Sequence, residues 1–304
     1  MATMIILLVS CFNTYAQKQP EERRVYYLDV TGSMKSNKIW DEVRNNLKKA
    51  IDNVQDETTE LIVIPFTDNN PGIDRVWKSM ATDEGKKYLK DEIDKVRYET
   101  SNCLTNLYLP LNDFCNNHID PNKINYMFLM TDGQDEEDRT QFRSLLQQWG
   151  GRYGEKHIYG FFVMLHKNAK DQQVEAIISK QKHLWKVETA DVNINLIRIE
   201  SDGIFNIRND EYVKFDISGL ADNIKIDVEA LENPNYRVLK TSKNNNQLRV
   251  YLKNLQEPSV LPEEINIILN VKSTISDRYT FLVTDKLHVT CQNKKERTLK
   301  LTIL

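Results

Sequence analysis

Residues 25–34 read Val-Tyr-Tyr-Leu-Asp-Val-Thr-Gly-Ser-Met, an apolar run that ends in an acid, two hydroxyl side chains and a glycine. A run that is apolar on both faces is typical of a buried parallel strand, and the carboxyl ends of such strands form the ligand crevice of open α/β sheets. Asp29, Thr31 and Ser33 alternate, so their oxygens can point to one side of a loop that bends at Gly32. Such hard oxygen donors suit Mg²⁺ or Mn²⁺ better than zinc, so the stretch predicts a metal site.

Two later segments carry further oxygen donors. Residues 124–130 form another run that is apolar apart from Asn125. It is followed by Thr131 and by Asp132, a second acid at a predicted strand end. Between the two runs, residues 101–106 lead into a predicted helix, and Thr105 lies where the loop meets that helix. The apolar residues of this helix recur at helical spacing: Leu104, Leu107, Tyr108, Leu111, Phe114 and Cys115.

Together these three segments resemble the von Willebrand factor type A (vWA) family and its metal-ion-dependent adhesion site (MIDAS). The family pattern is Asp-x-Ser/Thr-x-Ser after the first strand, a Thr in a later loop and an Asp after the fourth strand. The matching positions here are Asp29, Thr31, Ser33, Thr105 and Asp132. The resemblance implies that hydroxyl oxygens bind the cation directly while the acids often act through water. It also implies one open coordination position, which attracts a carboxylate from a partner protein.

The middle loop departs from the family pattern. The family usually has Gly-Gly before the middle Thr, whereas Cys103 and Leu104 precede Thr105 here. This difference leaves the shape of the loop open, with Thr100 or Ser101 as an alternative ligand.

The first residues differ in character from the rest of the chain. Residues 1–10 are nearly all apolar, and no charged residue occurs before Lys18. A run this short is typical of a secretory signal rather than a spanning helix, although a basic n-region is missing. The sequence allows two ways of processing this signal: cleavage of a signal peptide of residues 1–16, or a lipoprotein signal to residue 10 with lipidation of Cys11. We expect export to the periplasm, the cell surface or the extracellular space, with a buried first strand as the alternative.

The remaining chain divides into two patterns. Residues 17–23 are polar and predict a linker, and from 24 to 190 strands and helices alternate as in a doubly wound, mostly parallel α/β sheet flanked by helices. From 191 to 304 short runs of period two predict an all-β, antiparallel sandwich of immunoglobulin-like type, interpreted as a spacer or scaffold. These runs are residues 213–217, 224–228, 248–252, 265–271, 287–290 and 299–303.

Length and composition narrow the class of protein. With 304 residues the chain is long enough for two domains with ample core. Its 41 basic and 44 acidic residues give a net charge of −3, which argues against a nucleic-acid partner. No internal run is long enough to span a membrane, so membrane contact is expected only through lipidation. Four cysteines are too few for a disulfide framework, and the five histidines form no metal-ligand spacing.

Three functions remain open from the sequence. The first is a non-enzymatic binding module, in which Mg²⁺ or Mn²⁺ captures a Glu or Asp of a partner protein. The second is a phosphatase-like, metal-dependent hydrolase, although Thr31 replaces the second acid of the usual Asp-x-Asp that would begin at Asp29. The third is a scaffold with a degenerate metal site, an alternative that the altered loop before Thr105 supports. We expect the binding module.

Overall fold

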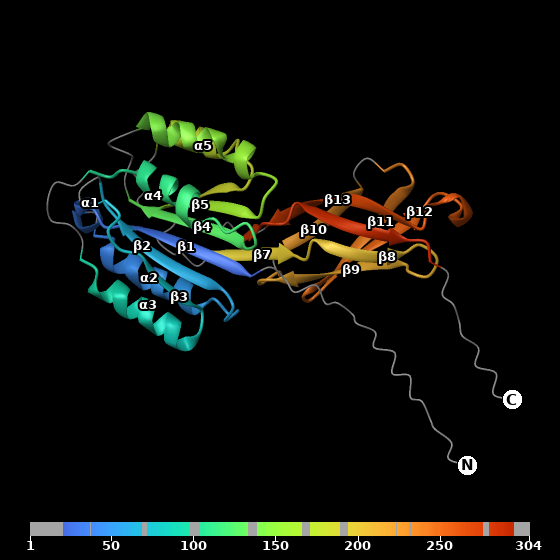
Figure 1. The fold of residues 1–304 in the computed structure, drawn as a ribbon, viewed down its shortest axis with the longest axis horizontal. Coiled ribbons are helices and arrows are strands. Elements are labelled where there is room, and N and C mark those ends of the chain that lie inside the picture. The colour runs from blue at the N-terminus through green and yellow to red at the C-terminus, as the bar shows by residue number, and fades with distance from the viewer. Residues whose placement is uncertain are drawn as a thin grey trace, which may run out of the picture.

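The structure is a computed structural model. It describes residues 21–36, 38–68, 72–97, 104–132, 139–165, 171–188, 194–222, 224–230, 233–275 and 280–294. An α/β unit with one six-stranded sheet lies beside an all-β region with two sheets along the long axis of the molecule (Figure 1). The predicted signal, Cys11 and the predicted domain boundary at 190 lie outside the described residues. Among the helices that the structure describes, none is long and apolar enough to cross a membrane.

The α/β unit is built on a sheet with the strand order β3-β2-β1-β4-β5-β6. The strands are β1 (Glu22–Asp29), β2 (Glu60–Phe66), β3 (Trp77–Met80), β4 (Ile124–Thr131), β5 (Ile158–Met164) and β6 (Leu184–Glu188). Neighbours pair in parallel except β3, an edge strand that runs antiparallel to β2. β2, β4 and β5 are buried along their whole length, as expected for parallel strands covered on both faces. The predicted doubly wound, mostly parallel sheet is confirmed.

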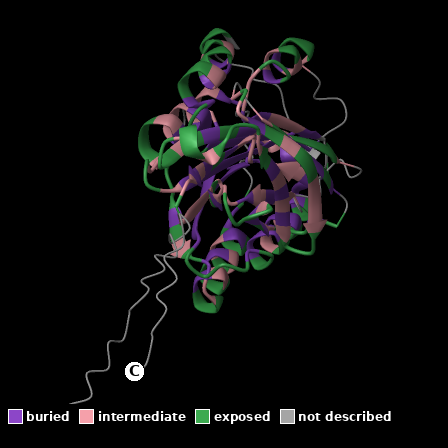
Figure 2. Cartoon of the chain, turned by 90° about the vertical axis from the view of Figure 1, so that its right-hand side faces the viewer, coloured by how far each residue is buried: buried purple, intermediate pink, exposed green. Residues whose placement is uncertain are grey.

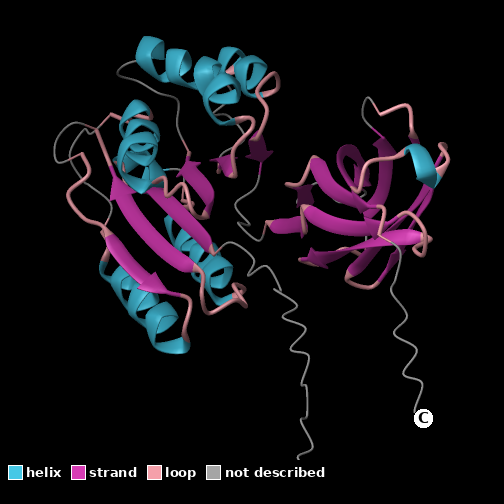
Figure 3. Cartoon of the chain, turned by 45° about the vertical axis from the view of Figure 1, so that its right-hand side comes forward, coloured by secondary structure: helices cyan, strands magenta, loops and turns pink. Residues whose placement is uncertain are grey.

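Helices cover both faces of this sheet (Figure 3). The helices are α1 (Gly32–Ser36), α2 (Trp40–Asp52), α3 (Asp83–Lys95), α4 (Tyr108–Asp113), η1 (Phe114–His118), α5 (Arg139–Tyr153) and α6 (Gln172–Ile178). One face packs against the apolar residues of α2 and α3, and the other against those of α4, η1, α5 and α6. Apolar residues are therefore buried on both faces of the sheet. In Figure 2 the buried colour is concentrated in the interior of the molecule, whereas the outer elements are largely intermediate or exposed.

β1 begins earlier than the sequence predicts. Its first residue is Glu22, which lies within the segment 17–23 that was predicted to be a linker. Arg23 and Arg24 belong to the strand because acids hold their side chains: Arg23 pairs with Glu60 of β2, and Arg24 Nη2 lies 2.9 Å from Glu22 Oε2. Charged residues that are paired in this way can extend a strand into a segment whose sequence has no apolar pattern typical of a strand.

The all-β region consists of two sheets that share one apolar core. Their orders are β10-β13-β15-β8 and β11-β12-β9-β7-β14. The strands are β7 (Asn195–Ile199), β8 (Asp202–Asn206), β9 (Tyr212–Ser218), β10 (Ile224–Ala230), β11 (Tyr236–Asn244), β12 (Gln247–Asn254), β13 (Glu264–Ile275), β14 (Thr280–Leu282) and β15 (Lys286–Gln292), with a 3₁₀ turn η2 (Pro258–Val260). In β9, for example, Val213, Phe215 and Ile217 are buried while the residues between them are exposed.

The strand pairing differs in some places from the antiparallel sandwich that was predicted. β14 pairs with β7, and β15 with β8, in parallel, while the other pairs are antiparallel. The first five predicted period-two runs lie within β9, β10, β12, β13 and β15, and the run 299–303 lies outside the described residues. The immunoglobulin-like type of this region stays a prediction.

Candidate metal site at the carboxyl edge of the sheet

β1 and β4 position the candidate site because they are parallel neighbours, so their carboxyl ends meet at the same edge of the sheet. Asp29 is the last residue of β1, and Asp132 directly follows the last residue of β4. Thr31 lies in the turn after β1, and Ser33 lies at the start of α1. Thr105 comes from the segment that precedes α4.

The five residues predicted from the sequence lie in one group connected by short oxygen contacts. Asp29 Oδ1 accepts hydrogen bonds from the backbone N–H of Thr31 at 2.9 Å and from its hydroxyl at 2.7 Å. Thr31 Oγ1 lies 2.9 Å from Ser33 Oγ and 3.5 Å from Thr105 Oγ1. The hydroxyl of Ser33 donates to Asp132 Oδ1 at 2.8 Å. Three segments that are distant in the sequence thus bring their side-chain oxygens together.

The site is buried, and its charge is concentrated on two acids. Asp29, Thr31, Thr105 and Asp132 are at most 3% exposed, whereas Ser33 is only partly buried. Burial first, and then the negative charge of Asp132, raise the pKa of Asp29 to about 7. Such a pair favours a nearby positive charge.

Thr131 is a site residue that the sequence reasoning missed. Its hydroxyl donates to Asp29 Oδ2 at 2.7 Å, on the side of the carboxylate opposite to Thr31. Thr131 is completely buried and holds the carboxylate of Asp29 in place. The signal was available, because Thr131 is a hydroxyl residue at the end of the same strand that positions Asp132.

The donor set fits a hard divalent cation such as Mg²⁺ or Mn²⁺. The hydroxyls of Thr31, Ser33 and Thr105 and the carboxylates of Asp29 and Asp132 offer only oxygen, which such ions prefer. Within the stretches of chain that the structure describes, no three His, Cys, Asp or Glu side chains form a group that could hold a metal. A site here would therefore depend on hydroxyl ligands as much as on acids.

The alternative ligands for the middle loop lie outside the described residues. Thr100 and Ser101 belong to the segment 98–103, so the structure places only Thr105 beside Thr31. The choice between Thr105 and these two residues stays open.

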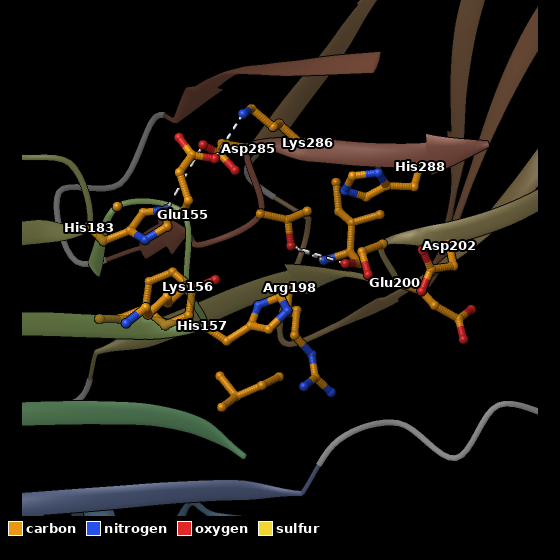
Figure 4. A pocket seen from close by; sticks show the side chains of 16 residues that line it. Glu155, Lys156, His157, His183, Arg198, Glu200, Asp202, Asp285, Lys286 and His288 are labelled. Carbon is orange, nitrogen blue, oxygen red and sulfur yellow. Dashed lines mark hydrogen bonds and ion pairs between the residues drawn. The ribbon is translucent and has the colours of Figure 1, made fainter. Parts of the chain in front are cut away.

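A second group of polar residues lies around a cavity of about 490 Å³ at the junction of the α/β unit and the all-β region (Figure 4). Its wall combines Glu155 from the connection before β5 with Asp285 from the connection before β15. Lys182 Nζ lies 3.0 Å from Glu155 Oε1 and 2.7 Å from Asp285 Oδ2, and Lys286 Nζ lies 2.9 Å from Glu155 Oε2. These acids are neutralised by lysines and link the two regions.

Comparisons with known proteins give remote similarities only. No family model matches the sequence, and no curated protein matches it. A von Willebrand factor type A protein from Catenulispora acidiphila is 14% identical with a TM-score of 0.45, over 90% of this chain and 67% of that one. Proximal thread matrix protein 1 from the mussel byssus, in a structure with a zinc-occupied MIDAS motif, is 12% identical with a TM-score of 0.43. That match covers 56% of this chain and 44% of the mussel protein.

A third similar structure is the pilus adhesin SpaC from Lactobacillus rhamnosus GG in its open conformation. It is 10% identical with a TM-score of 0.44, over 90% of this chain and 43% of the adhesin. The chain thus spans less than half of the length of the mussel protein and of SpaC. Similarities at this level are too low to establish a shared function.

Proposed function

We propose that this chain is a metal-dependent protein-binding module. In this proposal Asp29, Thr31, Ser33, Thr105 and Asp132 hold Mg²⁺ or Mn²⁺, and the bound cation captures a Glu or Asp side chain of a partner protein. The observation that carries the proposal is the contact chain from Asp29 through Thr31 and Ser33 to Asp132, with Thr105 beside it.

The hydroxyl-rich donor set supports capture of a carboxylate. In this proposal the acids act through water, so that three neutral hydroxyls bind the cation directly and its positive charge stays available for an additional anionic ligand. Ser33 is the most exposed of the five residues, so a partner would reach the cation from its side. Leu104, which directly precedes Thr105, is 44% exposed and offers an apolar contact next to the site.

The geometry of Asp29 favours this function over the hydrolase alternative. A phosphatase-like nucleophile needs a carboxylate oxygen that is free to attack. Here Oδ1 accepts two hydrogen bonds from Thr31, and Oδ2 accepts one from Thr131. Both oxygens are therefore directed to holding the loop, which suits a structural or metal-supporting role.

Export belongs to the same proposal. The apolar start of the chain, residues 1–10, is the feature that supports a secretory or lipoprotein signal. Periplasmic, cell-surface and extracellular placement are all compatible with capture of a partner protein.

Calorimetric titration of the purified protein with Mg²⁺ and Mn²⁺ tests the metal site. We expect one binding event in the intact protein and an affinity at least about 100-fold lower in Asp29→Ala, because one of the two carboxylates of the site is lost. Asp227→Ala, which removes an exposed acid of the all-β region, is the matched control and should bind as the intact protein does. Equal binding by Asp29→Ala, or no binding by the intact protein, refutes the proposal.

A second experiment tests capture of the partner. Peptides that contain one Glu should bind the Mg²⁺-loaded protein, and their Gln counterparts should not, because only the carboxylate can complete the coordination of the cation. Binding that persists after chelation of the metal contradicts this mechanism. Turnover of phosphate or ester substrates that is lost in Asp29→Asn would favour the hydrolase instead.

A further inference from the structure

The helices leave some of one sheet face for another element to cover. On the face covered by α2 and α3, the same apolar cluster continues under β5 and β6 through Phe161, Val163 and Val187. A parallel sheet is stable only when both faces are covered. The residues that complete the cluster at this place, Val283 and the partly buried Phe281, Leu196 and Ile194, come from the all-β region and the segment leading into it.

Residues 280–283, which we call the strap, make several of these contacts. The ring centroid of Phe281 lies 5.3 Å from that of Phe161 in an edge-to-face arrangement, and 5.9 Å from that of Trp185. Val283 is 2% exposed and belongs to the core of the α/β unit. Its backbone N–H donates to the carbonyl of Ile197 at 2.9 Å, which ties the strap to β7.

Successive side chains of the strap pack alternately against two different apolar cores. Phe281 and Val283 pack against the core of the α/β unit, whereas Leu282 between them packs against the core of the all-β region. Successive side chains of an extended segment point to opposite sides, so one short strand can join two apolar cores.

Ion pairs reinforce the same junction. Lys182 joins Glu155 to Asp285, and Lys286 also binds Glu155. Near the start of β1, Arg198 Nη1 lies 3.6 Å from Glu22 Oε1. Glu155, Arg198 and Asp285, which take part in these ion pairs, line the cavity of Figure 4.

We propose that the strap joins the α/β unit and the all-β region into a single cooperative folding unit, so that the all-β region is a rigid stalk and not a flexibly attached spacer. The carboxyl edge of the sheet and the all-β region lie toward opposite ends of the molecule (Figure 1). A partner bound at that edge would therefore keep a fixed orientation relative to the stalk. This inference does not depend on the metal, so its failure leaves the proposed function untouched.

Tryptophan fluorescence allows a direct test, because all four tryptophans, at positions 40, 77, 149 and 185, lie in the α/β unit. Val250→Ala removes volume from the core of the all-β region, where Val250 is fully buried. If the two regions unfold together, Val250→Ala should lower the Tm of the tryptophan transition of the full chain by about 3 °C or more. An unchanged tryptophan transition overturns the proposal.

The role of the strap itself is tested by repeating this comparison in a weakened strap. In a Phe281→Ala background, Val250→Ala should shift the tryptophan transition by less than half as much, because the two cores are no longer joined. Phe281→Leu, which keeps an apolar side chain, is the milder variant to use if Phe281→Ala has no cooperative transition, and it should give a smaller reduction of the shift. The same full shift in the intact and in the weakened strap overturns the role of residues 280–283.

Discussion

The two edges of the α/β sheet carry acids in opposite electrostatic settings. At the amino edge, Glu60 accepts hydrogen bonds from Lys78 and Arg23, and although burial acts to raise the pKa of Glu60, these cations hold it below its usual value. At the carboxyl edge, Asp29 accepts from hydroxyls, which act to lower its pKa, but burial and then the charge of Asp132 raise this pKa to about 7. Acids paired with lysine or arginine hold a fold together, whereas buried acids paired with hydroxyls favour a cation from outside.

The largest expected effect concerns the carboxyl edge. Asp29→Asn should weaken Mg²⁺ binding at least about 100-fold, yet leave the free energy of unfolding without metal within about 1 kcal/mol of the intact protein. The reason is that the loss of a hydrogen bond is offset by the loss of repulsion with Asp132. Calorimetric titration and urea unfolding in chelator measure the two quantities, and a large loss of stability in chelator would make Asp29 structural.

The opposite result is expected at the amino edge. Glu60→Gln should lower the free energy of unfolding by about 2 kcal/mol, because Arg23, Lys78 and Lys123 lose their shared partner. Affinity for Mg²⁺ should stay as in the intact protein. Urea unfolding followed by tryptophan fluorescence gives the first quantity, and a Glu60→Gln protein of unchanged stability would remove the contrast between the two edges.

A third prediction concerns pH at the junction. Burial lowers the pKa of His183 below its usual value, while Asp285 acts in the opposite direction and Lys182 in the same one. The stability that neutral His183 contributes should be complete above its unfolded pKa of about 6.5 and should fall as the pH drops below that value, because the unfolded chain then binds the proton more readily. Thermal unfolding at pH 7.5 and pH 5.5 measures this change.

His183→Asn is the matched variant for the pH prediction. Residue 183 has φ near 60°, a conformation that asparagine tolerates better than most residues, and asparagine does not titrate. We expect the variant to lose less stability than the intact protein between the two pH values. An equally steep loss in His183→Asn would assign the pH dependence to other groups, such as His157.

The smallest effect is expected for an exposed ion pair far from both edges. Lys272 and Glu229 face solvent on neighbouring strands of the all-β region, 2.6 Å apart. Lys272→Ala should change the free energy of unfolding by no more than about 0.5 kcal/mol, because water and salt screen such pairs. Urea unfolding provides the measurement, and a larger change would mean that pairing with lysine stabilises this fold wherever it occurs.

The sequence reveals the carboxyl edge more clearly than the all-β region for a physical reason. Asp29 and Asp132 follow long apolar runs, and parallel strands bring such ends together, so their proximity could be predicted. Thr131 was missed although it is a hydroxyl residue at the end of the strand that positions Asp132, because the family pattern that guided the choice of site residues does not include it.

The strands that the sequence did not reveal lack a clean alternation. β11 is largely exposed, so few of its residues carry an apolar signal. β14 has only three residues, and the consecutive residues Phe281, Leu282 and Val283 are all apolar because they face two different cores. Period-two alternation identifies a strand that has one buried and one exposed face. It does not identify a very short strand that is buried on both faces.

The two-sided strap also makes the chain sensitive to its residue count. If one residue were inserted directly before Thr280, every following side chain would exchange sides. Thr280 would take the place of Phe281, Phe281 that of Leu282, and Leu282 that of Val283. The short, hydroxyl-bearing side chain of Thr280 would then lie where Trp185 now contacts an aromatic ring, and the phenyl ring of Phe281 would enter the core of the all-β region. Insertions of two residues would restore the facing, so tolerance to length changes in this connection should follow an odd-even rule.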